Sequence, residues 1–599
     1  MGWLAQGGTG SPPAGGGAIG QVIGGTIGSL IITAAMFYLV FGHRSGRVKV
    51  LQRLGAYSER VSGLPPWAAL PLGVLSGSLL IAVFGMYWDI SCHLDAGRDP
   101  GPFANVSHYF ILAGLFGIFF SGLLAVFLPT ERPGAAALRL PGGLEAPLGG
   151  VLILVCSGIA LAGFPLDDVW HRIFGQDVTL WGPTHLQLFG GASLSTLGGM
   201  ILLVEGSRAS GDVGAHGAPR NLRYMQMALG GSFLVGLSTF QGEFDYAVPQ
   251  FRLVFHPILL MLASSIALVA VRIWAGRGAA LGAVALFLVI RGILSLLVTP
   301  LFGHTTLHFP LYIAEAAVVE LVALRVARDK PLMLGLLAGI GIGTVGLAAE
   351  WAWSYVWWTI EWPASMLVEG FVCGFVAAVA GGVIGSFVGR ALSAPELAPA
   401  PVPRFALPVA VVALVAVLAY ATPISSGDPI TAKVTLTDAK PPPKRQVNAT
   451  IRLNPPDAAD DAYWFVSTAW QGEEGNSPVE KLEKVSPGVY RTTKPLPVYG
   501  NWKTTIRLQK GTAVQGLPIY FPADKAIPVK GVPAQPSFTR SFKRDKQLLQ
   551  REQKSNVPGA LVLLAYLTVL LIGIALYASM GWGLALLQAK LARRPAASV

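Results

Sequence analysis

The chain has 599 residues, of which 53% are hydrophobic and only 13% are charged, and its mean hydropathy is +0.56. Soluble domains carry about 25% charged residues, so this composition excludes an ordinary water-soluble globular protein. The net charge of +12 would fit nucleic-acid binding in a soluble protein, but the placement of the basic residues gives it another explanation, and no nucleic-acid partner is expected.

Apolar stretches recur along the chain, and each is long enough to cross the bilayer core as a helix. We expect thirteen spans, near residues 19–41, 66–88, 107–129, 142–164, 182–205, 224–242, 249–271, 279–300, 308–326, 331–355, 364–388, 404–421 and 558–580. No basic region precedes the first span, which is therefore expected to be retained rather than cleaved as a signal. The sequence predicts a polytopic α-helical membrane protein whose first partner is the lipid bilayer.

Basic residues fall in alternate connections between these spans. They occur within residues 44–53, 132–139, 208–223, 272–277, 325–330, 390–404 and 590–594. Connections rich in Lys and Arg face the cytoplasm. We therefore expect a multi-pass protein of the cell membrane, with its N-terminus outside and its C-terminus in the cytoplasm.

One polar segment, residues 425–555, separates the last two expected spans and would lie outside the cell. Stretches such as "ITAKVTLTDA" and "NWKTTIRL" alternate or are rich in β-formers, with Pro and Gly between them. We expect an extracytoplasmic β-sandwich inserted before the last span. The chain then divides into a five-span region with paired Asp/His motifs, a seven-span region, the β-sandwich, and a C-terminal anchor with a cytoplasmic tail. Their bounds are 1–205, 206–424, 425–555 and 556–599.

The stretch "SPGVYRTTKPLPVYGNWKTTIRL" resembles the FixH/YtkA-like domains over about residues 430–520. These are small membrane-tethered β-modules often associated with copper-protein biogenesis. The segment contains no His, Cys or Met, so no copper site is expected within it.

Two stretches repeat the same rare residues 78 positions apart, which is the distance from Asp89 to Asp167. The first, "WDISCHLDAGRDPGPFANVSH", contains Asp89, His93 and His108, and the second, "LDDVWHRIFGQDVTLWGPTH", contains Asp167, His171 and His185. Each stretch also carries an aspartate six residues after its first histidine, Asp99 and Asp177. In both stretches the second histidine opens the next expected span.

The spacing of each motif suits a metal ion. Residues i and i+4 share one face of a helix, so the aspartate and the first histidine can approach one ion together. The second histidine returns after the chain folds back, which makes a three-ligand site with open positions. Such a site fits copper, with non-haem iron or zinc as alternatives. The simpler reading is a pair of hydrogen-bonded Asp–His groups without an ion.

These paired motifs resemble the C subunit of the particulate methane and ammonia monooxygenases, which carries two Asp/Asn-x3-His-x12–13-His motifs on successive helical pairs. The resemblance covers about residues 66–205. It implies copper sites at Asp89, His93 and His108 and at Asp167, His171 and His185. The present loops are a residue longer, and eight further spans follow.

A third group of ligand-type residues, His304, His308 and Glu315, lies in "FGHTTLHFPLYIAE". On a helix the two histidines would share a face with the glutamate, which predicts a third metal site or a proton route. Glu243, Asp245 and His256 belong to the same set of hypotheses; ordinary hydrogen-bonded helix packing is the alternative. We also expect Arg291 and Glu320 to pair near the middle of the membrane.

Two functions fit these observations. The first is a copper-dependent membrane monooxygenase-like oxidoreductase that uses O2 or a small apolar substrate. The second is a non-catalytic copper-handling or assembly factor that serves an extracytoplasmic oxidase. A structural subunit that docks other membrane subunits through its β-domain is a further alternative. A transporter fits less well, because the expected ligands gather at one face of the membrane.

Overall fold

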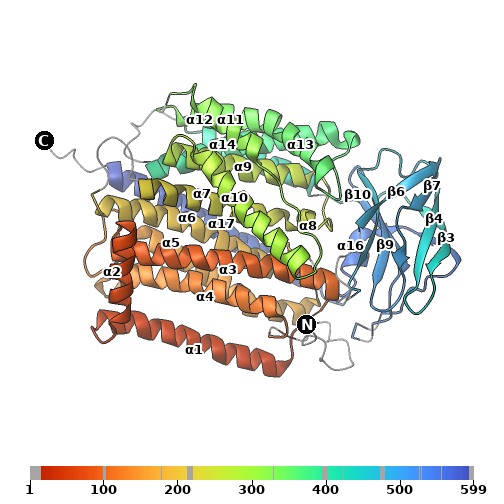
Figure 1. Ribbon diagram of the computed structural model, residues 1–599, viewed down its shortest axis with the longest axis horizontal. Helices are drawn as coiled ribbons and strands as arrows, with labels where there is room; N and C mark the ends of the chain where they lie inside the picture. Colours follow the sequence, from red (N-terminus) through yellow and green to blue (C-terminus); the bar gives the residue numbers. More distant parts are fainter. Residues whose placement is uncertain are drawn as a thin grey trace.

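The computed structural model describes residues 15–98, 101, 103–176, 179–211, 220–327, 329–393, 403–422, 424–472, 479–524, 526–527, 529–554 and 556–592. Figure 1 shows two parts: long helices that run side by side, and a β-domain at one end of them. The short helix α2 (Val50–Ser62) crosses the opposite end of the bundle.

The helical part alternates long apolar helices with short connections. Its first half holds α1 (Ile19–Arg44), α3 (Pro66–Ala96), α4 (Val106–Phe127), β1 (Leu138–Arg139), η1 (Pro141–Gly143), β2 (Glu145–Ala146), α5 (Leu148–Phe174), α6 (Pro183–Ala209), α7 (Arg220–Ser238), η2 (Thr239–Gln241), α8 (Gly242–Asp245) and α9 (Phe255–Ala275). The second half holds α10 (Ala279–Leu296), η3 (Leu297–Leu301), α11 (Ile313–Ala323), α12 (Pro331–Gly341), η4 (Ile342–Gly346), α13 (Leu347–Val356), η5 (Ala364–Met366), α14 (Leu367–Ser393), α15 (Ala406–Ala421) and α17 (Gly559–Ala592).

Among the described residues, ten helices are long and apolar enough to cross a membrane. Large apolar side chains cover the outside of the bundle, for example Ile23 and Leu30 on α1 and Leu563 and Leu571 on α17, each at least 55% exposed. Such a surface fits contact with lipid and not with water. A membrane-spanning helical protein is thus confirmed in outline.

The remaining three expected spans have no such helix. They fall on α7, on the 16-residue α15 and on α11, which has 11 residues and follows a stretch that is not helical. Helix α15 is apolar but short, and α7 begins with the polar stretch Arg220–Arg223. Before α11 the backbone itself is not helical, and hydropathy does not detect such a break because it registers apolar side chains in any conformation.

Two helical hairpins, α3 with α4 and α5 with α6, pack closely through small residues. A side chain at Gly114 of α4 would strike the backbone of Ala82 in α3, and one at Gly149 of α5 would strike the backbone of Leu202 in α6. Such close approach is typical of membrane helices that pack without a hydrophobic driving force. It brings the end of each hairpin into a fixed arrangement.

The β-domain begins after α15 and ends before α17. Its strands are β3 (Thr431–Lys440), β4 (Gln446–Asn454), β5 (Trp464–Trp470), β6 (Val479–Ser486), β7 (Val489–Thr492), β8 (Leu496–Pro497), β9 (Lys503–Lys510), β10 (Ala513–Tyr520), β11 (Ser537–Ser541) and β12 (Lys543–Arg544), followed by α16 (Asp545–Leu549). They are ordered β11-β3-β4-β7-β6-β5-β9-β10-β12, with β8 on β4, and pair antiparallel.

Strand β4 shows why this segment folds as a sheet around a core. Val447, Ala449, Ile451 and Leu453 are buried while the residues between them are exposed or half-buried. This period of two gives β4 one apolar face, and apolar residues of several strands of the nearly closed sheet form a core of their own. The expected sandwich-like β-domain is confirmed.

Candidate metal centres

The end of the first hairpin places the first ligand set. Helix α3 stops at Gly97, whose φ of 88° suits glycine and whose N–H donates to the carbonyl of His93 at 3.1 Å. Helix α4 begins where the Asn105 side chain accepts from the N–H of Ser107 at 3.1 Å. His93 therefore lies in the last turn of α3, and His108 in the first turn of α4.

Asp89 stands between the two histidines. Its Oδ1 lies 2.9 Å from Nε2 of His108 and 3.5 Å from Nε2 of His93. The expected helical spacing of Asp89 and His93 is confirmed, since both belong to α3. We call Asp89, His93 and His108 site 1.

The second hairpin repeats this arrangement. Helix α5 stops at Gly175, with φ of 84°, and α6 begins at Pro183. Oδ2 of Asp167 lies 3.1 Å from Nε2 of His171, and Oδ1 lies 3.5 Å from Nε2 of His185. We call Asp167, His171 and His185 site 2.

The ligand atoms of each site fit a metal ion. Within each set they lie within 4.8 Å of one another. Metal–ligand bonds of about 2.0–2.1 Å at angles near 90–110° separate neighbouring ligands by about 2.9–3.4 Å. The four Asp–His separations run from 2.9 to 3.5 Å. Hydrogen bonding alone explains the two shorter ones, whereas the two at 3.5 Å lie just beyond both an ordinary N–H···O bond and this ligand spacing. Imidazole and carboxylate without sulfur suit Cu(II), non-haem iron or zinc.

For three of the four histidines, the other ring nitrogen is directed at a backbone carbonyl. Nδ1 lies near the carbonyl oxygen of Gly97 at 2.8 Å for His93, of Gly175 at 3.3 Å for His171, and of Thr179 at 2.8 Å for His185. A ring that donates from Nδ1 presents the lone pair of Nε2, which is the usual arrangement of a metal-binding histidine. All three Nε2 atoms then face the carboxylates.

A hydroxyl supports each carboxylate. Ser107 donates to Oδ1 of Asp89 at 2.7 Å, and Thr184 donates to Oδ1 of Asp167 at 2.6 Å. Sequence reasoning missed both residues, although a signal was present: each directly precedes the second histidine of its motif. The glycine four residues after the first histidine is a second repeated feature that was missed.

Both sites line one cavity of about 730 Å³. Its other walls are mainly apolar, with Leu30 from α1, Val83 from α3, Phe116 from α4 and Leu188 from α6. Residues of the β-domain, Thr468, Trp470 and Gln471, complete the lining. The two sites thus share one cavity that reaches the β-domain. Asp99 and Asp177 lie outside the described residues.

The third expected group is not brought together. Residues 303–312 are not helical, so the expected helical spacing of His304 and His308 is wrong. Nδ1 of His304 lies 2.9 Å from Oδ2 of Asp95 instead. Within the described part of the chain, two groups of three ligand-type residues lie close enough to hold an ion, and they are site 1 and site 2. His304, His308 and Glu315 do not form a third such group there.

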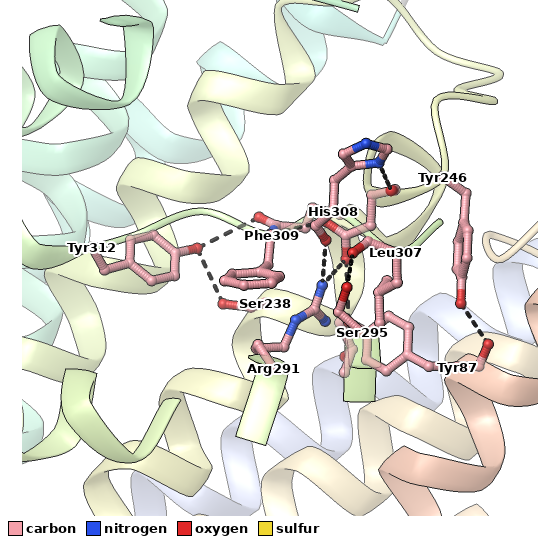
Figure 2. A network of polar contacts seen from close by, with 12 residues as sticks. Tyr87, Ser238, Tyr246, Arg291, Ser295, Leu307, His308, Phe309 and Tyr312 are labelled. Carbon is pink, nitrogen blue, oxygen red and sulfur yellow. Dashed lines mark hydrogen bonds and ion pairs between the residues drawn. The ribbon is translucent and has the colours of Figure 1, made fainter. Parts of the chain in front are cut away.

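This non-helical stretch follows a π-helix, η3, that contains Pro300. Its backbone is held by side chains, as Figure 2 shows: Nη2 of Arg291 donates to the carbonyl of His308 at 2.9 Å, and Ser295 donates to that of Leu307 at 2.9 Å. A buried backbone that has left its helix needs such partners, because its N–H and C=O groups have lost their bonds within the helix. His308 itself contacts backbone, with its N–H and its Nδ1 at 2.9 and 3.0 Å from the carbonyl of Asp245.

The buried ion pairs also differ from expectation. Arg291 pairs with Asp245 at 2.6 Å and lies over the ring of Tyr87, whereas Glu320 pairs with Arg272 at 2.7 Å. The expected Arg291–Glu320 pair is wrong. Although α10 and α11 are in contact, Glu320 accepts from the N–H groups of Gly278 and Ala280 at the start of α10, about three turns before Arg291.

Glu243 and His256 have hydrogen-bond partners of their own. Glu243 accepts from the Thr179 hydroxyl at 2.5 Å and from the N–H of Gln250 at 2.9 Å. Nδ1 of His256 accepts from the indole of Trp362 at 3.1 Å. Because the carbonyl of Thr179 faces His185, Glu243 supports site 2 from behind.

No family model matches this chain, and neither curated proteins nor solved structures include a match to it. The resemblances to the monooxygenase C subunit and to the FixH/YtkA-like domains therefore stay predictions that rest on the motifs themselves.

Proposed function

We propose that this protein binds two transition-metal ions, copper being the expected metal, at sites 1 and 2. One observation supports it above all: two hairpins present the same three ligands, each set within 4.8 Å, to one cavity. Chance burial of polar groups would not reproduce the same aspartate, histidines, hydroxyl and glycine twice. Non-haem iron and zinc are the alternatives for this donor set.

The apolar cavity favours an enzyme over a simple metal store. Two imidazoles and a carboxylate leave coordination positions open, and a bound copper or iron ion would supply redox chemistry with O2 at those positions. The chain's own contribution is to orient Nε2 of each histidine and to surround the sites with side chains such as Val83 and Phe116. We propose a monooxygenase-like oxidoreductase acting on a small apolar molecule.

A copper-handling protein is the second candidate. The β-domain, with its resemblance to modules of copper-protein biogenesis, lines the cavity next to site 1 through Gln471. In this function the β-domain would contact an extracytoplasmic oxidase or other membrane subunits and control metal transfer. Turnover of O2 by the metal-loaded protein separates the two candidates, because a handling protein would retain or pass metal without consuming O2.

Metal content is the direct test of the proposal. Purified wild-type protein should contain about two ions per chain by elemental analysis, which also identifies the metal. Replacing both carboxylates, Asp89→Asn with Asp167→Asn, keeps their size but removes the charge that the ions need, and should abolish binding. Wild-type protein that takes up no copper, iron or zinc would refute the proposed function.

The sidedness of the membrane is a separate proposal. We infer from the basic connections that the β-domain lies outside the cell. A maleimide that does not cross membranes should label Lys440→Cys, exposed at the end of β3, on intact cells. It should reach Arg47→Cys, exposed between α1 and α2, only after lysis. The reverse pattern would invert the topology.

A further inference from the structure

The β-domain contacts the C-terminal ends of the two helices that carry the first histidine of each site. The last four carbonyl groups of any helix lack partners within that helix. In α3 and in α5 these carbonyls belong to the turn that begins with the site histidine, His93 or His171. Residues of the β-domain, including its last segment 552–554, donate to some of these carbonyls, among them those of Leu94 and Phe174.

Gln471, directly after β5, makes the contact at site 1. Its N–H donates to the carbonyl of Leu94 at 2.8 Å, and its side-chain amide approaches the carbonyl of His93 at 3.4 Å. Its side chain also lies so close to Gly97 that a Cβ there would be 3.0 Å from it. The carbonyl of Gly97 faces Nδ1 of His93, so Gln471 packs against the residue that orients the His93 ring.

The segment 552–554 makes the corresponding contact at site 2. Gln553 forms an antiparallel bridge with Gly175, and the N–H of Lys554 donates to the carbonyl of Phe174 at 2.8 Å. A Cβ at Gly175 would lie 2.5 Å from the carbonyl oxygen of Glu552. Gly175 is the residue whose carbonyl faces Nδ1 of His171.

One buried side chain joins the two contacts. The ammonium group of Lys503, the first residue of β9, donates to the side-chain oxygen of Gln471 and to Oε1 of Glu552, the latter at 2.5 Å. Lys503 is 8% exposed, and Glu552 is 3% exposed and also lies 3.3 Å from Arg98. Burial lowers the pKa of the Lys503 ammonium, and the Glu552 carboxylate opposes that shift. A buried charge is costly unless it is paired, and the contacts with Gln471 and Glu552 pair the Lys503 ammonium group.

We propose that the β-domain acts as a clamp in which Lys503, through Gln471 and Glu552, holds the helix ends that orient His93 and His171. Lys503 is thus a positioning residue for both sites, whereas Gln471 positions site 1 alone. The link to metal affinity rests on the proposed function; the link to the helix ends does not. The clamp makes the two sites respond together to a change in the β-domain, although they share no ligand.

Three variants of the full-length protein in nanodiscs test the clamp. Lys503→Met removes both donated hydrogen bonds while keeping a side chain of similar length. Gln471→Gly removes the side chain but keeps the N–H, and it suits the positive φ of 60° at this position. Lys510→Met, at the exposed end of the same strand, is the matched control.

Hydrogen–deuterium exchange on metal-free protein gives the first readout. Lys503→Met should raise uptake in residues 89–98 and in 167–176, Gln471→Gly only in 89–98, and Lys510→Met in neither. Unchanged uptake in both segments of Lys503→Met would overturn the clamp, as would equal increases in both segments of Gln471→Gly. These results do not depend on whether metal binds.

Titration with Cu²⁺ gives the second readout. Lys503→Met should weaken binding at both sites by about tenfold and alter the nitrogen couplings in the Cu(II) electron paramagnetic resonance spectrum, as expected when an outer hydrogen bond to a metal-bound histidine is lost. Gln471→Gly should affect one ion of the two. A wild-type protein that binds no Cu²⁺ while showing the exchange pattern above would refute the metal function and leave the clamp supported.

Discussion

Sites 1 and 2 share their ligands but differ in what supports them. Asp89 accepts from Asn105 at 2.9 Å in addition to its serine, whereas among the described residues Asp167 accepts from the hydroxyl of Thr184 alone beside its histidines. The first histidine also differs, since the side chain of His93 is 30% exposed and that of His171 is 9% exposed.

The contacts that the β-domain makes with the two sites also differ. Gln471 touches Gly97 mainly through a side chain, whereas Gln553 joins Gly175 through backbone. What both sites keep is the aspartate, two histidines, a hydroxyl and a glycine cap. The same ligand geometry therefore forms in two different surroundings, so this shared set of residues accounts for it.

Removing a ligand should have the largest effect. His93→Ala and His171→Ala should each lower the metal content by about one ion per chain, because two remaining ligands do not enclose the ion. His43→Ala, at the far end of α1, should leave the content unchanged. Elemental analysis of the purified variants checks this. Loss of both ions from either single variant would show that the two sites are one centre.

Removing the hydroxyl that donates to the carboxylate should weaken metal binding more at site 2 than at site 1. Thr184→Val leaves Asp167 without its hydroxyl donor and should weaken metal binding at site 2 by about 100-fold, the upper range for such outer contacts. Ser107→Ala leaves Asn105 on Asp89 and should cost about tenfold at site 1, the lower range. Competition with a coloured chelator measures both. Equal losses would mean that Asn105 contributes nothing to the support of Asp89.

The two glycine caps should differ in their tolerance of a methyl group. Both Gly97→Ala and Gly175→Ala force a positive φ on alanine, at about 1–3 kcal/mol each. Gly175→Ala should be worse, because its new Cβ meets the backbone of Glu552 and not a flexible side chain. Thermal unfolding in detergent tests the order, with Gly211→Ala, at φ of 76° in open space, as the control for strain alone.

The smallest expected difference concerns access. Because His93 is more exposed than His171, diethylpyrocarbonate should modify His93 severalfold faster in metal-free protein. Mass spectrometry of the modified peptides reports the two rates. A faster reaction at His171 would show that the cavity opens at site 2 in solution.

Local chemistry determined much of this protein from sequence alone. Long apolar runs specified the membrane helices, period-two alternation specified the β-domain, and the i, i+4 spacing placed Asp89 with His93 on one helical face. The short loop between α3 and α4 then brings His108 next to Asp89 and His93. Each of these outcomes depends on residues close together in sequence, which is why a pattern predicts it.

Tertiary structure alone decided the rest. The break before α11 separated His304 from His308 because buried partners such as Arg291 satisfy an unwound backbone, and no periodicity reports those partners. The pairing of Arg291 with Asp245, and the contact of Gln471 with a helix end 378 residues away, depend on which elements become neighbours. Neighbours are chosen by the packing of whole surfaces, and that choice is not written in any short stretch of the chain.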